Sequence, residues 1–378
     1  MKNTQNSMAK VQSERLKNLL KNMVDIYSPP GKEEEITSFI YRYLRKHHLK
    51  VIKQKVDKQR YNLIIMPREY DEIELCFVGH LDTVTAYDLD DYRFSENGDT
   101  IPGLGTADMK AGCAAMIEAF TVLGEMGEPL PAVGLALVVD EEENNEGVRA
   151  LIDEYVFPWA VIGEPTNMIP CLNHYSYLEV LIRTRGKRAH SAMPEYGQNA
   201  IESMLKLLLK IVEYAKTASQ KPVCNIRELA SFPEGFIVAD ICEAWLDLHL
   251  PPDSRIDTLK TELQQLIEDM ETELPELNAD LRFEDTYSGY QISQERPVVE
   301  KLRKVYQALS MPWEFQDFRS HSDGNILWSA GVNPIILGPG LLEAAHTPEE
   351  AVSFSQVVRA AEVYLQFALS LSDGERAA

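Results

Sequence analysis

Three almost wholly apolar runs constrain the fold of this chain more than any other feature. They span residues 73–80 (IELCFVGH), 133–140 (VGLALVVD) and 159–165 (WAVIGEP). Strands that are apolar on both faces belong in the middle of a sheet that helices cover on each side. Helical patterns at 113–126 and 148–156 separate the runs. This alternation predicts an α/β domain with a mostly parallel sheet and helices on both faces.

The pattern changes in the middle of the chain. Residues 177–186, 238–250 and 281–288 read as strands, and two amphipathic helices at 200–218 and 255–274 lie between them. This block predicts a small α+β domain inserted into the first one. The catalytic domain would then be discontinuous, with residues 1–175 and 290–378, and the insertion would be 176–289. A length of 378 residues also favours two domains.

Charge excludes several classes of partner. Acidic residues number 59 against 37 basic ones, which gives a formal net charge of −22. Such a chain repels phosphate backbones and anionic lipid, so we expect neither nucleic acid nor a membrane as partner. The first twenty residues are polar, which predicts no secretory signal. Five scattered cysteines without a C-x-x-C motif predict reduced thiols and a cytoplasmic protein.

Histidines and acids gather where the predicted strands end, or in glycine-rich turns. The candidates are His80, Asp82, Asp108, Glu141, Glu142, Glu164 and His346. Because the carboxyl ends of parallel strands share one edge of a sheet, we expect these side chains to meet. Two imidazoles and several carboxylates brought together repel one another unless a cation lies among them. Nitrogen and oxygen ligands of this kind suit zinc, cobalt or manganese rather than calcium.

Two spacings in this set have a chemical reason. His80 and Asp82 are two residues apart on a strand and so point the same way, which lets the aspartate fix the tautomer of a ligating imidazole. Glu141 and Glu142 are adjacent. One carboxylate of such a pair can bind a metal while its neighbour takes a proton from water.

Short motifs in a fixed order make the chain recognisable. They are GHLDTV (79–84), GTADMKAG (105–112), DEE (140–142), GEPT (163–166), AHSA (189–192), SDGN (322–325), GPG (338–340) and HTPEE (346–350). The ordered set resembles the M20 metallopeptidases, which include acetylornithine deacetylase, succinyl-diaminopimelate desuccinylase, aminoacylases and glutamate carboxypeptidase. The resemblance implies a zinc-hydrolase catalytic domain with an inserted lid and dimerisation domain.

The resemblance also implies a ligand set. His80 and Glu164 would hold one metal, Glu142 and His346 the other, and Asp108 would bridge them. The cofactors would be two divalent ions, zinc first, with cobalt or manganese as alternatives. The Asp108–Met109 peptide would be cis, as is usual in the family.

Catalytic roles follow from the same resemblance. Glu141 would be the general base on a metal-bridging water and then the acid that protonates the leaving amine. Asp82 would orient His80. His190, in the insertion, would stabilise the oxyanion and reach the partner's active site in a homodimer formed through the lid. The substrate would be a small peptide or an N-acyl amino acid. A dipeptidase or aminopeptidase is the alternative to a deacylase, and a metal-binding pseudoenzyme would have lost some of these residues.

The chain departs from the family pattern in the insertion. Many relatives hold the substrate carboxylate with an asparagine and an arginine, and aligning on Asp247 puts Phe236 and His249 at these positions. Either another cation takes over (Arg319, Lys187 and Arg188 are the candidates) or the substrate lacks that carboxylate. Thr106 stands where many relatives carry an arginine.

Overall fold

The computed structural model describes residues 10–67, 73–89, 92–127, 131–232 and 235–371. Part of the polar N-terminus, on which the prediction of no signal peptide rests, lies outside these ranges. The chain divides into two compact units. The first contains residues 1–172, 292–318 and 322–378, and the second contains residues 173–291 and 319–321. The predicted insertion, 176–289, falls inside the second unit.

A large mixed sheet has its central strands in the first unit, while β12 and the end of β7 belong to residues of the second unit. Its strands follow the order β1-β2-β5-β3-β6-β14-β7-β12, with β13 also paired to β7. The bounds are β1 Ile52–Lys55, β2 Tyr61–Ile65, β3 Leu75–His80, β5 Val133–Val138, β6 Trp159–Ile162, β7 Cys171–His174, β12 Tyr290–Gln291, β13 Gln316–Phe318 and β14 Asn333–Ile336. The four central strands, β5, β3, β6 and β14, run parallel. A mainly parallel centre with helices confirms the predicted α/β class.

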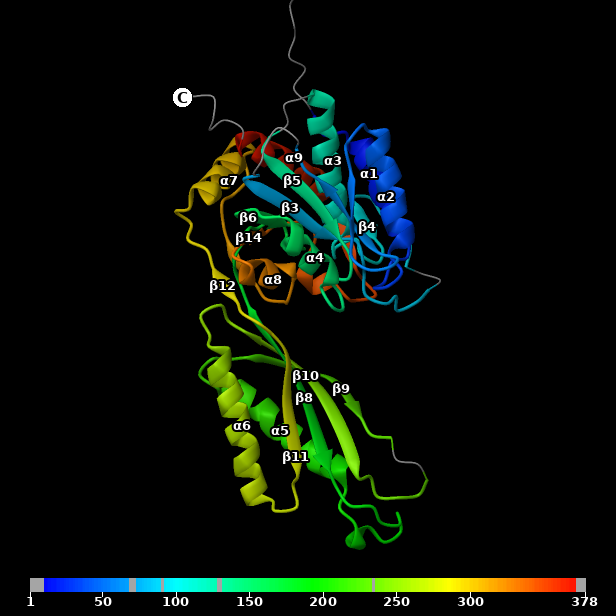
Figure 1. Cartoon of the computed structure of the whole chain (residues 1–378), viewed down its shortest axis with the longest axis vertical. Helices are drawn as coiled ribbons and strands as arrows, with labels where there is room; N and C mark the ends of the chain where they lie inside the picture. Colours follow the sequence, from blue (N-terminus) through cyan, green and yellow to red (C-terminus); the bar gives the residue numbers. More distant parts are fainter. Residues whose placement is uncertain (1–9, 68–72, 90–91, 128–130, 233–234, 372–378) are drawn as a thin grey trace, which may run out of the picture. The chain divides into compact units, whose positions relative to one another are not determined.

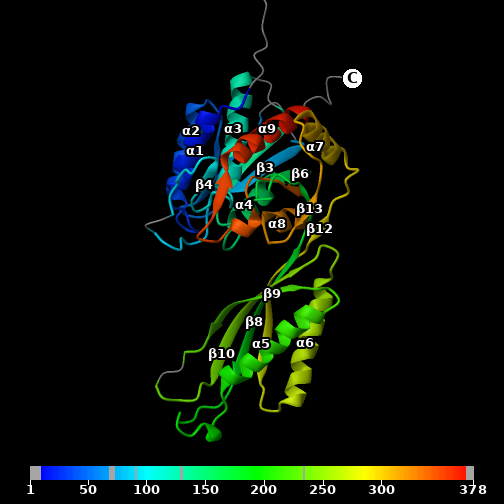
Figure 2. The same ribbon diagram turned by 180° about the vertical axis from the view of Figure 1, so that it is seen from behind.

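Helices cover both faces of this sheet (Figure 1). One group, α1, α3, α7 and α9, is connected by mutual contacts, and α4 and α8 contact each other on the other side, as the reverse view also shows (Figure 2). The bounds are α1 Ser13–Val24, α2 Glu34–Lys46, α3 Lys110–Met126, α4 Glu146–Glu154, α7 Pro297–Ala308, α8 Asp323–Ser329 and α9 Phe354–Leu371. A short ladder pairs β4 (Thr100–Pro102) with β15 (Ala351–Ser353), and a 3₁₀ turn spans Leu342–Ala344.

Burial explains why the apolar runs become central strands. Every residue of β3 and β5 is buried, as a strand covered on both faces requires. Phe77 of β3 packs edge-on against Phe120 of α3 and Tyr364 of α9, and thus joins the sheet to two helices. The parallel register pairs His80 with Val138. The chain segments that follow these two residues therefore leave the sheet side by side.

The second unit is a four-stranded antiparallel sheet with two helices. The order is β11-β8-β10-β9, with β8 Ser176–Arg185, β9 Val223–Ala230, β10 Ile241–Leu250 and β11 Ala279–Tyr287. Helix α5 (Ala200–Thr217) packs on β8 and β10, and α6 (Ile256–Glu273) packs on α5 and β11. A 3₁₀ turn spans Pro194–Tyr196. Alternate residues of β10 are buried against the helices. Strand β9 was not predicted.

Among the described helices, none is both long and apolar enough to cross a membrane.

Candidate metal centre

His80 is the last residue of β3, and its ring is oriented by the chain that follows it. Its Nδ1 lies 3.1 Å from the backbone carbonyl oxygen of Asp82 and 3.7 Å from Asp82 Oδ1. A proton on Nδ1 can be donated to that carbonyl, which leaves Nε2 to face the carboxylates. Asp82 is fully buried and accepts a hydrogen bond from the Glu142 backbone N–H at 2.9 Å. Asp82 therefore links the segments after β3 and β5.

Asp108 lies in the glycine-rich loop before α3, between two imidazoles. Its Oδ1 is 3.2 Å from His80 Nε2, and its Oδ2 is 3.3 Å from His346 Nε2. The two oxygens of one carboxylate thus face different histidines. The Asp108–Met109 peptide is cis, which confirms the expectation from the family resemblance.

The loop after β5 carries the paired glutamates. Glu142 Oε2 lies 3.2 Å from His346 Nε2, so Glu142 and Asp108 Oδ2 face the same imidazole ring. Glu141 faces the other imidazole, with Oε2 4.0 Å from His80 Nε2. Adjacent residues thus point to different parts of the cluster. Both side chains are at least nine-tenths buried.

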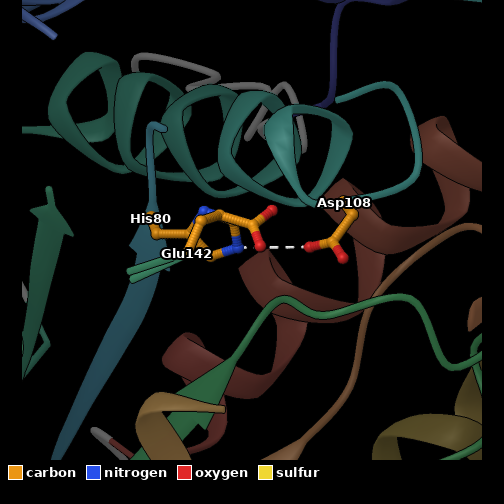
Figure 3. Close-up of side chains that lie close together, drawn as sticks. All are labelled: His80, Asp108 and Glu142. Atoms are coloured by element: carbon orange, nitrogen blue, oxygen red, sulfur yellow. Dashed lines mark hydrogen bonds and ion pairs between the residues drawn. The ribbon is translucent and has the colours of Figure 1, made fainter. Parts of the chain in front are cut away.

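Glu164 follows β6, the neighbour of β3 in the sheet. Its Oε1 lies 3.5 Å from His80 Nε2. Figure 3 shows His80, Asp108 and Glu142 converging from three segments that are far apart in sequence. Ligand atoms of these three residues lie within 4.8 Å of one another. The structure therefore brings together all five residues that the sequence singled out as metal ligands, with His346 half-exposed and the other four at most about one-tenth exposed.

The charged groups of the cluster perturb one another strongly. Burial by itself would lower the pKa of His80, but the carboxylates of Glu164 and Asp108 outweigh burial and raise this pKa well above its ordinary value. Hydrogen bonds to Asp108 and Glu142 raise the pKa of His346 to about 11. Burial raises the pKa of Glu164 to about 8. The two imidazoles and Glu164 thus bind protons more tightly than usual. A divalent cation bound among the same carboxylates would neutralise their charge instead.

The donor set fits a transition metal. It consists of imidazole nitrogens and carboxylate oxygens, which suit zinc, manganese or cobalt. One buried oxygen, Asp82 Oδ1, has no hydrogen-bond partner within the described part of the chain and lies on the Nδ1 side of the His80 ring. A carboxylate on that side favours an imidazole that binds metal through Nε2.

His190 belongs to the second unit. It is exposed, and its Nδ1 accepts a hydrogen bond from the Ala192 backbone N–H at 3.1 Å. The neighbouring Ser191 N–H donates to the Phe236 carbonyl oxygen, and the Phe236 side chain is 85% exposed. The role of His190 at the oxyanion stays a prediction.

His249, at the position of the family's arginine, lies on β10 with its ring centroid 5.2 Å from that of Tyr177. Burial lowers its pKa. Among the alternative cations, Arg188 pairs with Asp240 at 2.7 Å, the Arg319 guanidinium lies over the Tyr175 ring, and Lys187 is exposed.

Sequence reasoning missed the residues that hold the Glu141–Glu142 loop. Asn145 Nδ2 donates to the Glu141 carbonyl oxygen and to Asp323 Oδ1, both at 3.2 Å. Arg60 Nη1 lies 3.0 Å from Asp140 Oδ1, in a buried ion pair beside this loop. The motifs DEE and SDGN contain some of these residues, but only long-range contacts reveal the partnership.

Thr106 is buried, and its hydroxyl donates to the Gly103 carbonyl oxygen at 2.6 Å.

An imidazole–carboxylate cluster at one edge of a mainly parallel sheet is an arrangement that metallohydrolases use. More particularly, residues 76–370 match the model of peptidase family M20/M25/M40, and the chain belongs to this family.

Relatives and solved structures agree with this family. An acetylornithine deacetylase of Vibrio parahaemolyticus is 27% identical over 323 residues, which cover 81% of this chain and 83% of that protein. A tripeptidase of Staphylococcus aureus has a TM-score of 0.80 at 22% identity, with coverage of 96% and 99%. A Bacillus subtilis protein described as a dinuclear metal-binding peptidase of family M20 has a TM-score of 0.68 at 12% identity, with coverage of 95% and 98%.

Proposed function

We propose that this chain is a dinuclear metal-dependent hydrolase that cleaves an amide bond in a small peptide or an N-acyl amino acid. The position of Asp108 carries the proposal, because its two oxygens face two different imidazoles at 3.2 and 3.3 Å. A carboxylate placed in this way suits a bridge between two cations. The Bacillus subtilis neighbour, described as a dinuclear metal-binding peptidase, supports two ions rather than one.

The other ligands divide into two pairs around Asp108. His80 and Glu164 are 3.5 Å apart and would hold one ion. Glu142 and His346 are 3.2 Å apart and would hold the other. Each ion would thus share Asp108 and have one imidazole and one further carboxylate. Zinc is the ion we expect, with cobalt or manganese as alternatives.

The chain's own residues supply the proton transfers. Two divalent cations, when bound, lower the pKa of water and polarise the scissile carbonyl. Glu141 is buried next to the ligands and lies farther from His80 than Asp108 or Glu164 does. Its carboxylate would accept the proton of the attacking water and later deliver a proton to the leaving amine. Asp82 would keep His80 in the tautomer that leaves Nε2 free, and His190 would stabilise the oxyanion in the partner's active site of the homodimer.

The relatives point to both classes of substrate. One is named an acetylornithine deacetylase and one structural neighbour a tripeptidase, and both activities hydrolyse an amide. We also propose a homodimer formed through the second unit and a cytoplasmic location, on the family resemblance and the free cysteines.

The test combines a substrate panel with a matched pair of variants. Zinc- or cobalt-loaded protein is incubated with dipeptides, tripeptides and N-acetyl, N-succinyl and N-formyl amino acids, and amine release is followed. Glu141→Gln should lose about 10²- to 10⁴-fold in rate and still bind two ions. Glu143→Gln changes an exposed neighbour in the same loop and should behave as wild type. Equal rates in the two variants would refute the role of Glu141, and no release from a two-metal protein would refute the substrate class.

A further inference from the structure

Glu350 is a buried carboxylate that touches no ligand side chain in the interactions described above. It is 4% exposed and follows His346 by four residues. Its Oε1 accepts hydrogen bonds from the backbone N–H groups of Ala107 at 2.8 Å and Asp108 at 3.0 Å. Its Oε2 accepts a third from Gly105 at 3.0 Å. Three convergent N–H groups form a concave anion site, which this side chain fills.

The same two segments are joined at further points. The backbone carbonyl oxygen of Glu350 accepts from the Gly103 N–H at 3.1 Å. Immediately beyond, β4 and β15 pair in an antiparallel ladder, with Ala351 opposite Pro102. The loop that carries Asp108 and the segment that follows His346 are therefore attached along a continuous line of contacts. Glu350 is the member of that line that binds the backbone N–H of Asp108.

We propose that Glu350 is a positioning residue that sets the Asp108 carboxylate between the two metal positions. This inference rests on the metal centre proposed above. Glu350 Oε1 accepts a hydrogen bond from the backbone N–H of Asp108, which fixes this part of the loop, and Glu350 also belongs to the segment that carries His346. Loss of its acceptor oxygens would let the bridging carboxylate move relative to both imidazoles. A side-chain amide offers one acceptor oxygen where Glu350 uses two, so it does not replace these hydrogen bonds.

The geometry predicts which substitution is informative. Glu350→Gln replaces one carboxylate oxygen with an NH₂ group. In one orientation this NH₂ group faces the Gly105 N–H, and in the other it faces the N–H groups of Ala107 and Asp108. At least one donor is then left unpaired in a buried place. Glu349→Gln is the matched control, because it removes the same charge from the adjacent, exposed residue. Glu350→Asp keeps the charge on a side chain one methylene shorter and serves if the glutamine variant does not fold.

The experiment measures the metal centre rather than turnover. Zinc affinity is determined on the full chain by competition with a chromophoric chelator, and the visible spectrum of the cobalt-loaded protein reports ligand geometry. Thermal melting in chelator reports the fold without metal. We expect Glu350→Gln to weaken zinc binding about 10- to 100-fold, the range found when groups that orient metal ligands are removed. Its cobalt spectrum should also change, while Glu349→Gln matches wild type in both.

Each outcome separates the two proposals. A folded Glu350 variant that shows wild-type zinc affinity and cobalt spectrum overturns the positioning role, as does a variant that lowers only the melting temperature. If wild type and Glu349→Gln bind no zinc, the metal centre itself is wrong and the inference fails with it. Weakened zinc binding with a changed cobalt spectrum, confined to Glu350 variants, supports the inference.

Discussion

Removing one terminal ligand from each side of Asp108 tests whether the cluster holds two ions or one. His346→Ala takes away the imidazole that faces Glu142, and Glu164→Gln takes away a carboxylate that faces His80. If the ligands form two positions that share Asp108, wild type binds two divalent ions and each variant keeps one tight ion. A single ion held by His80, Asp108 and Glu142 would give one ion in wild type and still one in His346→Ala.

The size of the effect follows from the number of donors. On the side of Glu142 three donors are available, namely Asp108, Glu142 and His346. Loss of a residue that merely orients a ligand costs 10- to 100-fold in affinity, so loss of the ligand itself should cost at least about 100-fold, or about 2.7 kcal/mol.

Equilibrium dialysis followed by elemental analysis gives the number of bound ions directly. His48→Ala is the matched control, because His48 is also an exposed histidine with a positive φ, 63° against 59° for His346. The control should bind two ions. Two tight ions in His346→Ala, or one in wild type, would refute the division of the ligands into two pairs.

Two further predictions concern stability. Burial raises the pKa of Glu33 to about 7, and neither of its oxygens has a hydrogen-bond partner in the described ranges. The folded state therefore binds the proton of the Glu33 carboxyl more tightly than the unfolded state does. Protonated Glu33 stabilises the fold at pH 4, and this contribution is lost as the pH rises through 7. Glu33→Gln should gain up to about 3 kcal/mol over wild type at pH 8 and nothing comparable at pH 4 in denaturant titrations, and an equal difference at both pH values would contradict this. In α3, a Cβ at Gly112 would lie 2.2 Å from the Gly163 carbonyl oxygen, whereas the nearest atom to one at Gly124 would be the end of the Leu49 side chain, at 2.9 Å. Gly112→Ala should therefore lose about 1 to 3 kcal/mol in thermal or denaturant unfolding and Gly124→Ala should not, and similar stabilities would refute the close packing.

The sequence predicts an element well where burial determines its pattern of apolar residues, either as a continuous run or as an alternation. The runs that became β3, β5 and β6 are apolar on both faces, and β10 alternates, so each shows its environment in its residues. Strand β9 is an edge strand that is exposed along most of its length. Its residues therefore carry no period. Helix α8 is only seven residues long and depends on a capping box at Ser322, a signal too short for periodicity to detect.

The site divides in the same way. Metal-type side chains at strand ends are visible in the sequence because the carboxyl ends of parallel strands lie at one edge of a sheet, and this reasoning identifies His80, Glu142 and Glu164. Glu350 and Asn145 act on backbone groups of distant segments. Every residue has a backbone carbonyl, and every residue except proline has a backbone N–H, so such partnerships leave no pattern in side-chain types. Only the fold shows that a glutamate four residues after His346 meets the loop of Asp108.

Charge balance suggests what this chain recognises in its substrate. Two divalent ions with the three ligand carboxylates leave one positive charge, and an ionised Glu141 cancels it. A substrate carboxylate then needs a cation from elsewhere. Burial lowers the pKa of His249, so its ring is neutral near pH 7, and Arg188 is already paired with Asp240.

We therefore expect the free carboxylate of a substrate to add little to binding. An N-acetyl amino acid and its C-terminal amide should be hydrolysed with kcat/KM values within about tenfold of each other. A charge-assisted pair with the substrate carboxylate would favour the free acid by more than about tenfold, and we expect no such pair here. Initial rates of amine release on matched pairs of acid and amide measure the ratio. A preference of several hundredfold for the free acid would contradict the argument. Lys187→Met and Arg319→Met would then be compared, and the variant that loses the preference would identify the cation.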